Sequence, residues 1–334
     1  GVACRVQNRS LKQLDKVKGR GPDKHYTLHI ADRGRVAQFV PHRSLKVRRL
    51  VERAWPGPLT VVFEVDPGDL GGLQQNLPQQ VFASLYRDSC IGIRCPDHPV
   101  ASALLRRTAH PVVAPSANPA GQPPAREARQ VLDYFEGKID LVLDGGPCRH
   151  GRSSTVVRAG ARGLEVVREG VYDCHTLVAW AHVQVLLVCT GNTCRSAMAE
   201  GLFHQELARR LGCRVDELAS MGYTVLSAGT ADLVGMPAST GALAACSRMG
   251  VDIRMHRSRG LSASLIEESE LIFGMEESHR EGVLALCPQA ADRCMLLDPD
   301  GEIADPIGQP LEVFQRCAQQ IQRAIEKRVA ERIL

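Results

Sequence analysis

The chain has 334 residues, of which 44% are hydrophobic and 23% charged, with a net charge of +4, and this length predicts two domains that each bury a core. No stretch approaches the ~20 apolar residues of a membrane helix and no secretory signal is visible, so we expect a soluble, cytoplasmic protein without membrane partners. Twelve cysteines, irregularly spaced and without a Cys-x2-Cys pair, argue against a zinc ribbon or a disulfide scaffold and indicate reduced thiols.

Charge is divided unevenly between the two predicted domains, residues 1–178 and 183–334. Residues 1–178 hold 26 Lys and Arg against 17 Asp and Glu, whereas the remainder of the chain holds 15 against 20. The positive excess of the first domain favours a polyanionic partner such as a nucleotide or RNA. The second domain has no such excess.

Strands outnumber helices in the pattern of the first domain. Helices are predicted near 11–17, 100–107 and 126–135, and strands near 26–30, 59–65, 91–94, 111–118, 139–143, 155–158 and 164–168. Several of these strands end in Ser, Asn, Arg or Lys instead of apolar residues. Such side chains can bind phosphates and other polar groups of a ligand.

Six segments of the first domain resemble the YrdC-type threonylcarbamoyl-AMP synthases in order and spacing. They are Lys18-Gly19-Arg20, Trp55 to Thr60, Arg94 to Pro99, Ala114 to Gly121, Asp144-Gly145-Gly146 and Ser154 to Val157. The resemblance implies a twisted, mainly parallel α/β sheet with a basic concave cavity. It also implies an enzyme that joins L-threonine, bicarbonate and ATP, with magnesium, into threonylcarbamoyl-AMP for the t6A modification of tRNA.

The same resemblance assigns candidate binding residues. Lys18, Arg20, Ser116, Asn118 and Arg168 are implied to face the nucleotide and its phosphates, and Arg94 and Ser154 to lie nearer the threonine. In-line attack at the α-phosphorus needs charge neutralisation more than a protein nucleophile, and a magnesium ion usually shares that work.

One segment of the synthase family is missing from the sequence. Its threonine-binding Pro-Thr-Glu-Thr-x-Tyr-Gly is expected upstream of Lys18, and only the final glycine is present, as Gly1. We therefore expect a domain that is incomplete at its N-terminus, with weak or absent synthase activity. The non-catalytic alternative is a module that binds double-stranded RNA without turning over ATP.

The second domain follows a connector at 175–182 and alternates strands with helices. Strands are predicted near 183–188, 223–230, 271–275 and 295–297, and helices near 195–211, 240–249, from 277 and from 311. This alternation predicts a doubly wound, Rossmann-like parallel sheet. In such a sheet a ligand binds at the carboxyl ends of the strands.

The first of these strands runs into the loop Cys189-Thr190-Gly191-Asn192-Thr193-Cys194-Arg195-Ser196. A strand-loop-helix junction gathers unpaired backbone N–H groups at the positive end of a helix dipole, which is an anion site. These dipoles and Arg195 are expected to stabilise a thiolate at Cys189. Cys-x5-Arg also occurs at Cys287 and Cys317, but without a glycine between its ends. In this full context the loop resembles the phosphate loop of the low-molecular-weight protein phosphatases.

These residue types predict hydrolysis of phosphorylated protein side chains through a phosphocysteine. Cys189 attacks phosphorus while loop N–H groups and Arg195 hold the phosphoryl oxygens. Asp305, in a Pro-Gly loop, is the candidate general acid and then the base for water, a role that the family resemblance supports. Neither a metal nor a cofactor is required. Support for the loop is expected from Thr190, Gly191, Asn192, Thr193, Cys194, Ser196, Ser227 and His256.

Two features bear on the substrate of the second domain. Tyrosine-directed phosphatases usually follow Asp-Pro with two aromatic residues, whereas Ile307-Gly308 follow here, and Thr193 resembles the protein-arginine phosphatases. We therefore favour phosphoarginine over phosphotyrosine. The alternative is an arsenate reductase, because that group shares the loop and adds a second cysteine pair, for which Cys287 and Cys294 are candidates.

Overall fold

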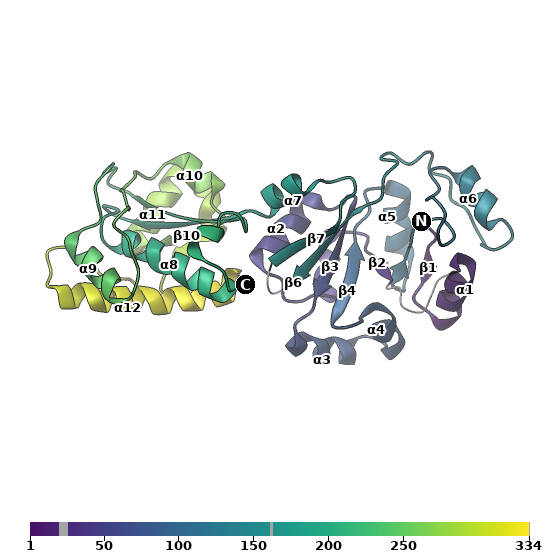
Figure 1. Ribbon diagram of the computed structural model, residues 1–334, viewed down its shortest axis with the longest axis horizontal. Coiled ribbons are helices and arrows are strands. Elements are labelled where there is room, and N and C mark those ends of the chain that lie inside the picture. The colour runs from purple at the N-terminus through teal and green to yellow at the C-terminus, as the bar shows by residue number, and fades with distance from the viewer. Residues whose placement is uncertain (20–25, 161–162, 334) are drawn as a thin grey trace. The chain divides into compact units, whose positions relative to one another are not determined.

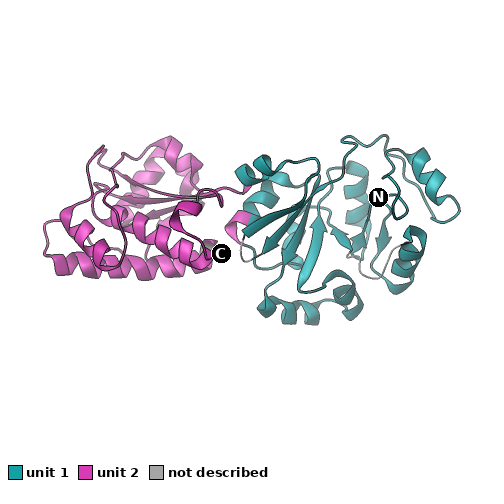
Figure 2. Ribbon diagram, viewed as in Figure 1, with its two compact units in different colours: residues 1–43, 47–180 teal, residues 44–46, 181–334 magenta. Residues whose placement is uncertain are grey.

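The computed structural model describes residues 1–19, 26–160 and 163–333. It divides into two compact units, one formed by residues 1–43 and 47–180 and the other by residues 44–46 and 181–334 (Figure 2). Both units combine helices with a β-sheet (Figure 1).

The described part of the first unit contains one mixed β-sheet. Its strands lie in the order β1 (Cys4–Arg5), β5 (Val112–Val113), β2 (Thr27–His29), β4 (Cys90–Arg94), β3 (Leu59–Glu64), β6 (Thr155–Gly160) and β7 (Gly163–Arg168). Only the β2–β4 and β3–β6 pairs are parallel, and the other four pairs are antiparallel. The mainly parallel sheet that the family resemblance implied is therefore wrong, because four of the six strand pairs are antiparallel.

Buried apolar residues alternate with other residues along the strands, so this sheet has one buried apolar face. Leu28, Ile93, Val61 and Val157 occupy successive paired positions on β2, β4, β3 and β6, and each is at most 1% exposed. Residues paired across a sheet point to the same side, so these side chains form one apolar layer. The unit's helices are α1 (Asn8–Lys18), α2 (Leu45–Ala54), α3 (Pro67–Asn76), α4 (Gln79–Leu85), α5 (Pro99–Arg107), α6 (Ala128–Phe135) and α7 (Cys174–Ala181), with a 3-10 helix at Arg33–Gln38.

One predicted strand of the first unit is not formed. Residues 139–143 have no strand partner, and Leu141 and Leu143 are 72% and 54% exposed. An alternating apolar pattern favours an extended chain, but a strand also needs a neighbouring edge to bond with.

The second unit contains a parallel sheet in the order β11 (Cys294–Leu296), β10 (Leu271–Gly274), β8 (Val183–Cys189) and β9 (Tyr223–Gly229). All seven residues of β8 are buried. Val183, Val185 and Leu187 belong to one core and Leu186 and Val188 to another, because helices cover both faces of the sheet.

Helices cover the two faces as a doubly wound sheet requires. In Figure 1, α8 (Arg195–Leu211), α9 (Thr240–Arg248) and α12 (Leu311–Arg328) lie on one side, and α10 (Ala263–Glu268) and α11 (Glu277–Leu286) on the other. A π-helical turn at Val329–Ile333 and 3-10 helices at Val215–Glu217 and Pro288–Arg293 complete the unit. From β8 the chain goes to β9 on one side and then to β10 on the other. The carboxyl end of β8, at Cys189, therefore lies at the switch point where such sheets bind ligands.

Candidate active site at the end of strand β8

Cys189 ends β8 and is 3% exposed. Its Sγ accepts a hydrogen bond from the backbone N–H of Asn192 at 3.3 Å and lies 2.9 Å from Ser196 Oγ. The chain folds back over the sulfur because Asn192 adopts a left-handed φ of 53°. Asparagine tolerates this conformation better than most residues.

The side chain of Asn192, which is fully buried, fixes the direction of the Ser196 hydroxyl. Asn192 Nδ2 donates to Ser196 Oγ at 2.8 Å and to Ser227 Oγ at 2.7 Å, and its Oδ1 accepts from the backbone of Arg259 at 2.9 Å. Since each serine oxygen already accepts a bond from this amide, its own proton must go elsewhere. Ser227 therefore donates to Glu200, and the Ser196 hydroxyl is held toward Cys189 Sγ.

Burial raises the pKa of the Cys189 thiol, and the hydrogen bonds from Ser196 and Asn192 and the charge of Arg195 oppose that rise without cancelling it. The sequence predicted a stabilised thiolate. In the structure the charge of Arg195 is directed to two carboxylates, Glu276 and Asp305, which reduces its effect on the sulfur.

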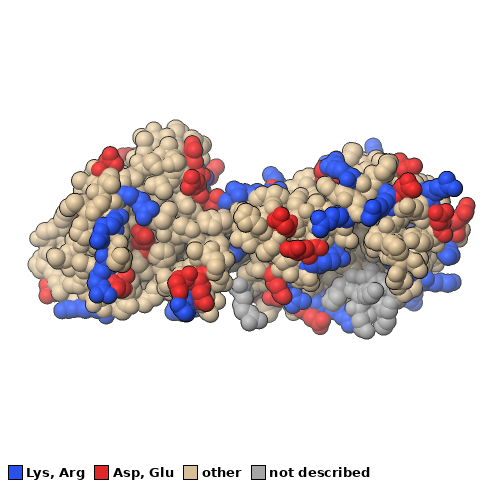
Figure 3. Space-filling model, turned by 45° about the horizontal axis from the view of Figure 1, so that its top comes forward, with Lys and Arg blue, Asp and Glu red and all other residues tan. Residues whose placement is uncertain are grey.

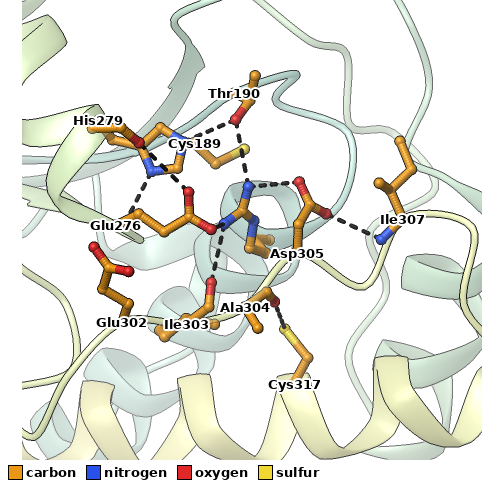
Figure 4. A network of polar contacts seen from close by, with 12 residues as sticks. Cys189, Thr190, Glu276, His279, Glu302, Ile303, Ala304, Asp305, Ile307 and Cys317 are labelled. Carbon is orange, nitrogen blue, oxygen red and sulfur yellow. Dashed lines mark hydrogen bonds and ion pairs between the residues drawn. The ribbon is translucent and has the colours of Figure 1, made fainter.

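Arg195 is 1% exposed, and its partners Thr190, Glu276, Ile303 and Asp305 are labelled in Figure 4. Its Nη1 donates to a Glu276 carboxylate oxygen and, at 3.0 Å, to the carbonyl of Ile303. Its Nη2 donates to Asp305 Oδ2 at 2.6 Å and to Thr190 Oγ1 at 3.4 Å. The remaining donor, Nε, is buried and has no hydrogen-bond partner among the described residues.

The candidate acid Asp305 is held beside the loop by its ion pair with the Arg195 guanidinium. One carboxylate oxygen contacts Arg195 and the other accepts a hydrogen bond from the backbone of Ile307 at 3.1 Å. Its side chain is 34% exposed, so a proton can exchange with solvent. The structure thus joins Arg195 and Asp305 by an ion pair. Cys189 makes its own hydrogen bonds with Ser196 and Asn192, and the charge of Arg195 opposes the rise that burial causes in the pKa of its thiol.

The remaining predicted loop residues have partners around the same turn. His256 Nε2 lies 2.7 Å from the carbonyl of Asn192, and His256 Nδ1 lies 3.6 Å from a Glu200 oxygen. Cys194 Sγ donates to Ser239 Oγ at 3.2 Å, and Thr193 Oγ1 lies 3.8 Å from the same sulfur. A side chain at Gly191 would meet Leu233 Cδ1 at 3.5 Å.

Sequence reasoning missed several residues of this site. Glu276 and His279 lie at the start of α11, and Leu233 lies in the loop after β9. Glu276 comes two residues after β10, near the carboxyl end of a parallel strand, and that position was an available signal. Leu233 had no comparable local signal, because its approach to Gly191 depends on the path of a long loop.

The predicted residues of the first unit form two groups. Lys18 Nζ donates to the carbonyls of Ser116 and Asn118, and lies 3.4 Å from Asn118 Oδ1. Arg168 donates to the carbonyl of Ser154 at 2.8 Å, and Ser154 Oγ lies 3.0 Å from Thr60 Oγ1. Arg20 lies outside the described residues.

Arg94 lies on the same row of the sheet as the second group. Arg94 of β4 pairs with His29 of β2 on one side and with Thr60 of β3 on the other. Thr60 in turn pairs with Val156 of β6, and Val156 pairs with Arg168 of β7. Their side chains therefore share the face opposite the apolar layer. Arg94 Nε is buried without a hydrogen-bond partner among the described residues.

A cavity of about 630 Å³ opens in the first unit, further along these strands. Its lining includes Thr27, Val62, Glu64, Gly92 and Arg158, and none of the residues predicted from the synthase resemblance. We assign the candidate ligand site by the predicted side chains and not by this cavity. On the face drawn in Figure 3, Lys and Arg side chains occur in separate groups with Asp and Glu between them.

Within the described residues, no group of three or more His, Cys, Asp or Glu side chains could hold a metal ion. No helix in that part of the chain is both long enough and apolar enough to cross a membrane. Cys287 and Cys294, the candidate second cysteine pair, are free thiols, 1% and 3% exposed, in the core on the α11 side of the sheet.

Two family models match the chain. Residues 1–170 match the Sua5/YciO/YrdC model, described as telomere recombination, and residues 184–333 match the model of low molecular weight phosphotyrosine protein phosphatases. The threonylcarbamoyl-AMP synthase of Bacillus subtilis (strain 168) is 34% identical over 47% of this chain and 43% of its own length. The chain spans about two fifths of the length of this synthase and of that from Pyrococcus abyssi.

Relatives of the second unit match over most of their length. The "Probable low molecular weight protein-tyrosine-phosphatase EpsP" of Ralstonia nicotianae is 31% identical over 42% of this chain and 90% of its own. The protein-arginine-phosphatase of Geobacillus stearothermophilus is 31% identical over 45% of this chain and 95% of its own.

Proposed function

The chain joins a member of the Sua5/YciO/YrdC family, residues 1–170, to a member of the low-molecular-weight phosphotyrosine protein phosphatase family, residues 184–333, and on this premise we propose two activities. The second unit hydrolyses phosphorylated protein side chains through a phosphocysteine at Cys189. The first unit transfers an adenylyl group from ATP.

Arg195 Nε, which has no hydrogen-bond partner among the described residues, is the observation that carries the phosphatase proposal. Leaving a buried N–H without an acceptor costs about 1–3 kcal/mol, so a ligand that supplies the acceptor accounts for it. The donor lies in the first turn of α8, where the helix dipole favours an anion. A phosphoryl oxygen meets both requirements.

The proposed reaction has two steps. In the first, Cys189 gives its proton to water and Sγ bonds to phosphorus, while the bond from phosphorus to the substrate oxygen or nitrogen breaks and Asp305, protonated from water, gives that atom a proton. The phosphoryl oxygens compete for the N–H groups of Arg195 and release Asp305 from its ion pair. In the second, Asp305 takes a proton from water, the water oxygen bonds to phosphorus, and the sulfur–phosphorus bond breaks, which releases inorganic phosphate and the Cys189 thiolate.

Phosphoarginine is the proposed preferred side chain. Support comes from Thr193 in the loop, from the absence of an aromatic pair after Asp305-Pro306, and from the likeness to a protein-arginine-phosphatase. Ile307, in the place of the first aromatic residue, is 65% exposed. Turnover of free phosphoarginine and phosphotyrosine by the parent and by Thr193→Ile tests the preference. Faster phosphotyrosine turnover by the parent contradicts it.

Hydrolysis of para-nitrophenyl phosphate tests the phosphatase activity itself. We expect turnover by the parent and none by Cys189→Ser, with phosphate binding retained in that variant. Unchanged turnover in Cys189→Ser rejects the mechanism. Adding arsenate tests the reductase alternative, because loss of protein thiols that depends on arsenate supports a reductase.

For the first unit we propose a site for threonylcarbamoyl-AMP synthesis from ATP, L-threonine and bicarbonate, with the weak or absent turnover expected without the family's threonine-binding segment. Lys18 contacts both Ser116 and Asn118, which supports this proposal. Further support comes from the buried Nε of Arg94, which has no hydrogen-bond partner among the described residues and lies on the same polar sheet face as Arg168. These residues supply positive charge and not metal ligands, so a magnesium ion would be held mainly by the phosphates of ATP. ATP and tRNA are cytoplasmic compounds, so we place the activity there.

Release of pyrophosphate that depends on both L-threonine and bicarbonate tests this activity. A chain that shows no such release but binds double-stranded RNA tightly favours the non-catalytic alternative. Because RNA affinity falls steeply with salt, the two measurements share one buffer of fixed ionic strength.

A further inference from the structure

His279 is buried beside the candidate phosphate loop and has no role in the proposed reaction. It lies in the first turn of α11 and is 2% exposed. Its Nδ1 accepts a hydrogen bond from the backbone N–H of Glu276 at 3.0 Å, and its Nε2 lies 2.9 Å from Thr190 Oγ1 (Figure 4).

These contacts determine the tautomer of His279. A backbone N–H can only donate, so Nδ1 carries no proton, and the neutral ring must carry its proton on Nε2. His279 therefore donates to Thr190 Oγ1. Burial lowers the pKa of His279, and the neighbouring Arg195 charge lowers it further, so the ring is neutral near pH 7.

The Thr190 hydroxyl oxygen then accepts two hydrogen bonds, one from His279 and one from Arg195 Nη2. Its own proton must point away from both donors, and no described residue accepts it. Thr190 is exposed and directly follows Cys189. The proton is thus available to a ligand that binds at the loop beside Cys189.

We propose that Thr190 donates this proton in a hydrogen bond to a phosphoryl oxygen of the substrate, and that His279 is a positioning residue that acts through Thr190. The inference rests on the proposed phosphatase function of the second unit. In this proposal the phosphoryl group accepts hydrogen bonds from the Thr190 hydroxyl as well as from the loop N–H groups and Arg195. A hydrogen bond to a charged oxygen contributes about tenfold to a hundredfold in binding or rate.

Thr190 is tested with two variants in the full chain. Thr190→Val keeps the shape of the side chain but removes the hydroxyl, and Thr190→Ser restores it. We expect Thr190→Val to lower kcat/KM for para-nitrophenyl phosphate at least tenfold and Thr190→Ser to remain within about threefold of the parent. A Thr190→Val variant within twofold of the parent overturns the proposal.

His279 is tested with a matched pair that separates its two contacts. His279→Asn places a side-chain oxygen where Nδ1 of the histidine lies. This variant keeps an acceptor for the Glu276 N–H but removes the donor to Thr190. Gln places an N–H near Nε2, which keeps that donor. We expect His279→Asn to lose activity as Thr190→Val does and His279→Gln to retain more. Equal losses in the pair indicate a role in capping α11 only and overturn the positioning role.

A double variant tests whether His279 acts through Thr190. In the Thr190→Val background we expect His279→Asn to cause no further loss, because the group it positions is gone. The same fold loss in both backgrounds contradicts the mechanism.

Calorimetric titration with inorganic phosphate separates this inference from the proposed function. If the parent binds phosphate but has no turnover, the phosphatase proposal fails. Weaker phosphate binding by Thr190→Val still supports the inference in that case, and unchanged binding overturns it.

Discussion

Replacing Asn192 with alanine removes the side chain that organises the candidate phosphate loop. Asn192 is fully buried and makes hydrogen bonds to Ser196, Ser227 and the backbone of Arg259. It also holds a left-handed backbone with φ of 53°. The change therefore affects both the bonds and the backbone conformation.

The expected loss of stability follows from these contacts. Three hydrogen bonds at about 1 kcal/mol each contribute about 3 kcal/mol, and a left-handed alanine costs about 1 kcal/mol more. We therefore expect the free energy of unfolding of the second unit to fall by about 4 kcal/mol in Asn192→Ala. In Asn192→Gly, the matched control, the backbone term disappears and the fall is about 3 kcal/mol.

Urea denaturation at fixed pH measures this loss one unit at a time. Both tryptophans, Trp55 and Trp180, lie in the first unit, so their fluorescence reports on that unit alone. Circular dichroism follows both units, and the transition that shifts with added inorganic phosphate is that of the second. We also expect kcat/KM to fall at least a hundredfold in both variants, because the Ser196 hydroxyl is no longer oriented. Asn192→Gly with the stability and activity of the parent refutes the reasoning, since the hydrogen bonds would then contribute nothing.

Three further changes test other parts of the structure. A Cβ added at Gly229 would lie 2.7 Å from the Thr190 carbonyl oxygen and 3.1 Å from the Asn192 nitrogen, so it would push against the candidate phosphate loop. Gly229→Ala is therefore expected to lower phosphatase kcat/KM at least tenfold while the circular dichroism spectrum stays that of the parent. Burial lowers the pKa of His29 from 6.5 to about 4, so between pH 6.5 and 4 the unfolded chain binds more protons than the folded chain. The first unit therefore loses up to about 3 kcal/mol of stability as pH falls through this range. Urea unfolding followed by tryptophan fluorescence should show a smaller loss at acid pH in His29→Gln, and an equal loss contradicts the assignment. Lys18→Met removes the charge between Ser116 and Asn118 and should weaken ATP binding about tenfold by calorimetry, whereas unchanged affinity places the nucleotide elsewhere.

Local signals were sufficient to predict the second unit's sheet and its loop. The buried run of β8, the glycine in the loop and the following helix specify strand, turn and helix in sequence order, and parallel pairing follows from that alternation. The first unit lacks this regularity. Its sheet mixes parallel and antiparallel pairs, and pairing depends on contacts between distant segments that no local pattern encodes.

The candidate site was predictable only where a residue is close in sequence to the loop or belongs to a recognised motif. Cys189, Arg195 and Asp305 met that condition. Glu276 and His279 did not, because they reach Arg195 and Thr190 from α11, more than eighty positions along the chain. The thiol pKa was also beyond sequence reasoning, since it depends on burial and on the carboxylates that share the charge of Arg195.

Detection of a phosphocysteine tests the central claim most directly. Para-nitrophenolate leaves without a proton, so Asp305→Asn should slow mainly the second step and allow the intermediate to accumulate. Mass spectrometry of the acid-quenched Asp305→Asn variant is predicted to find one phosphoryl group on the peptide that contains Cys189. Phosphate on another residue, or steady turnover without any phosphocysteine, contradicts the account.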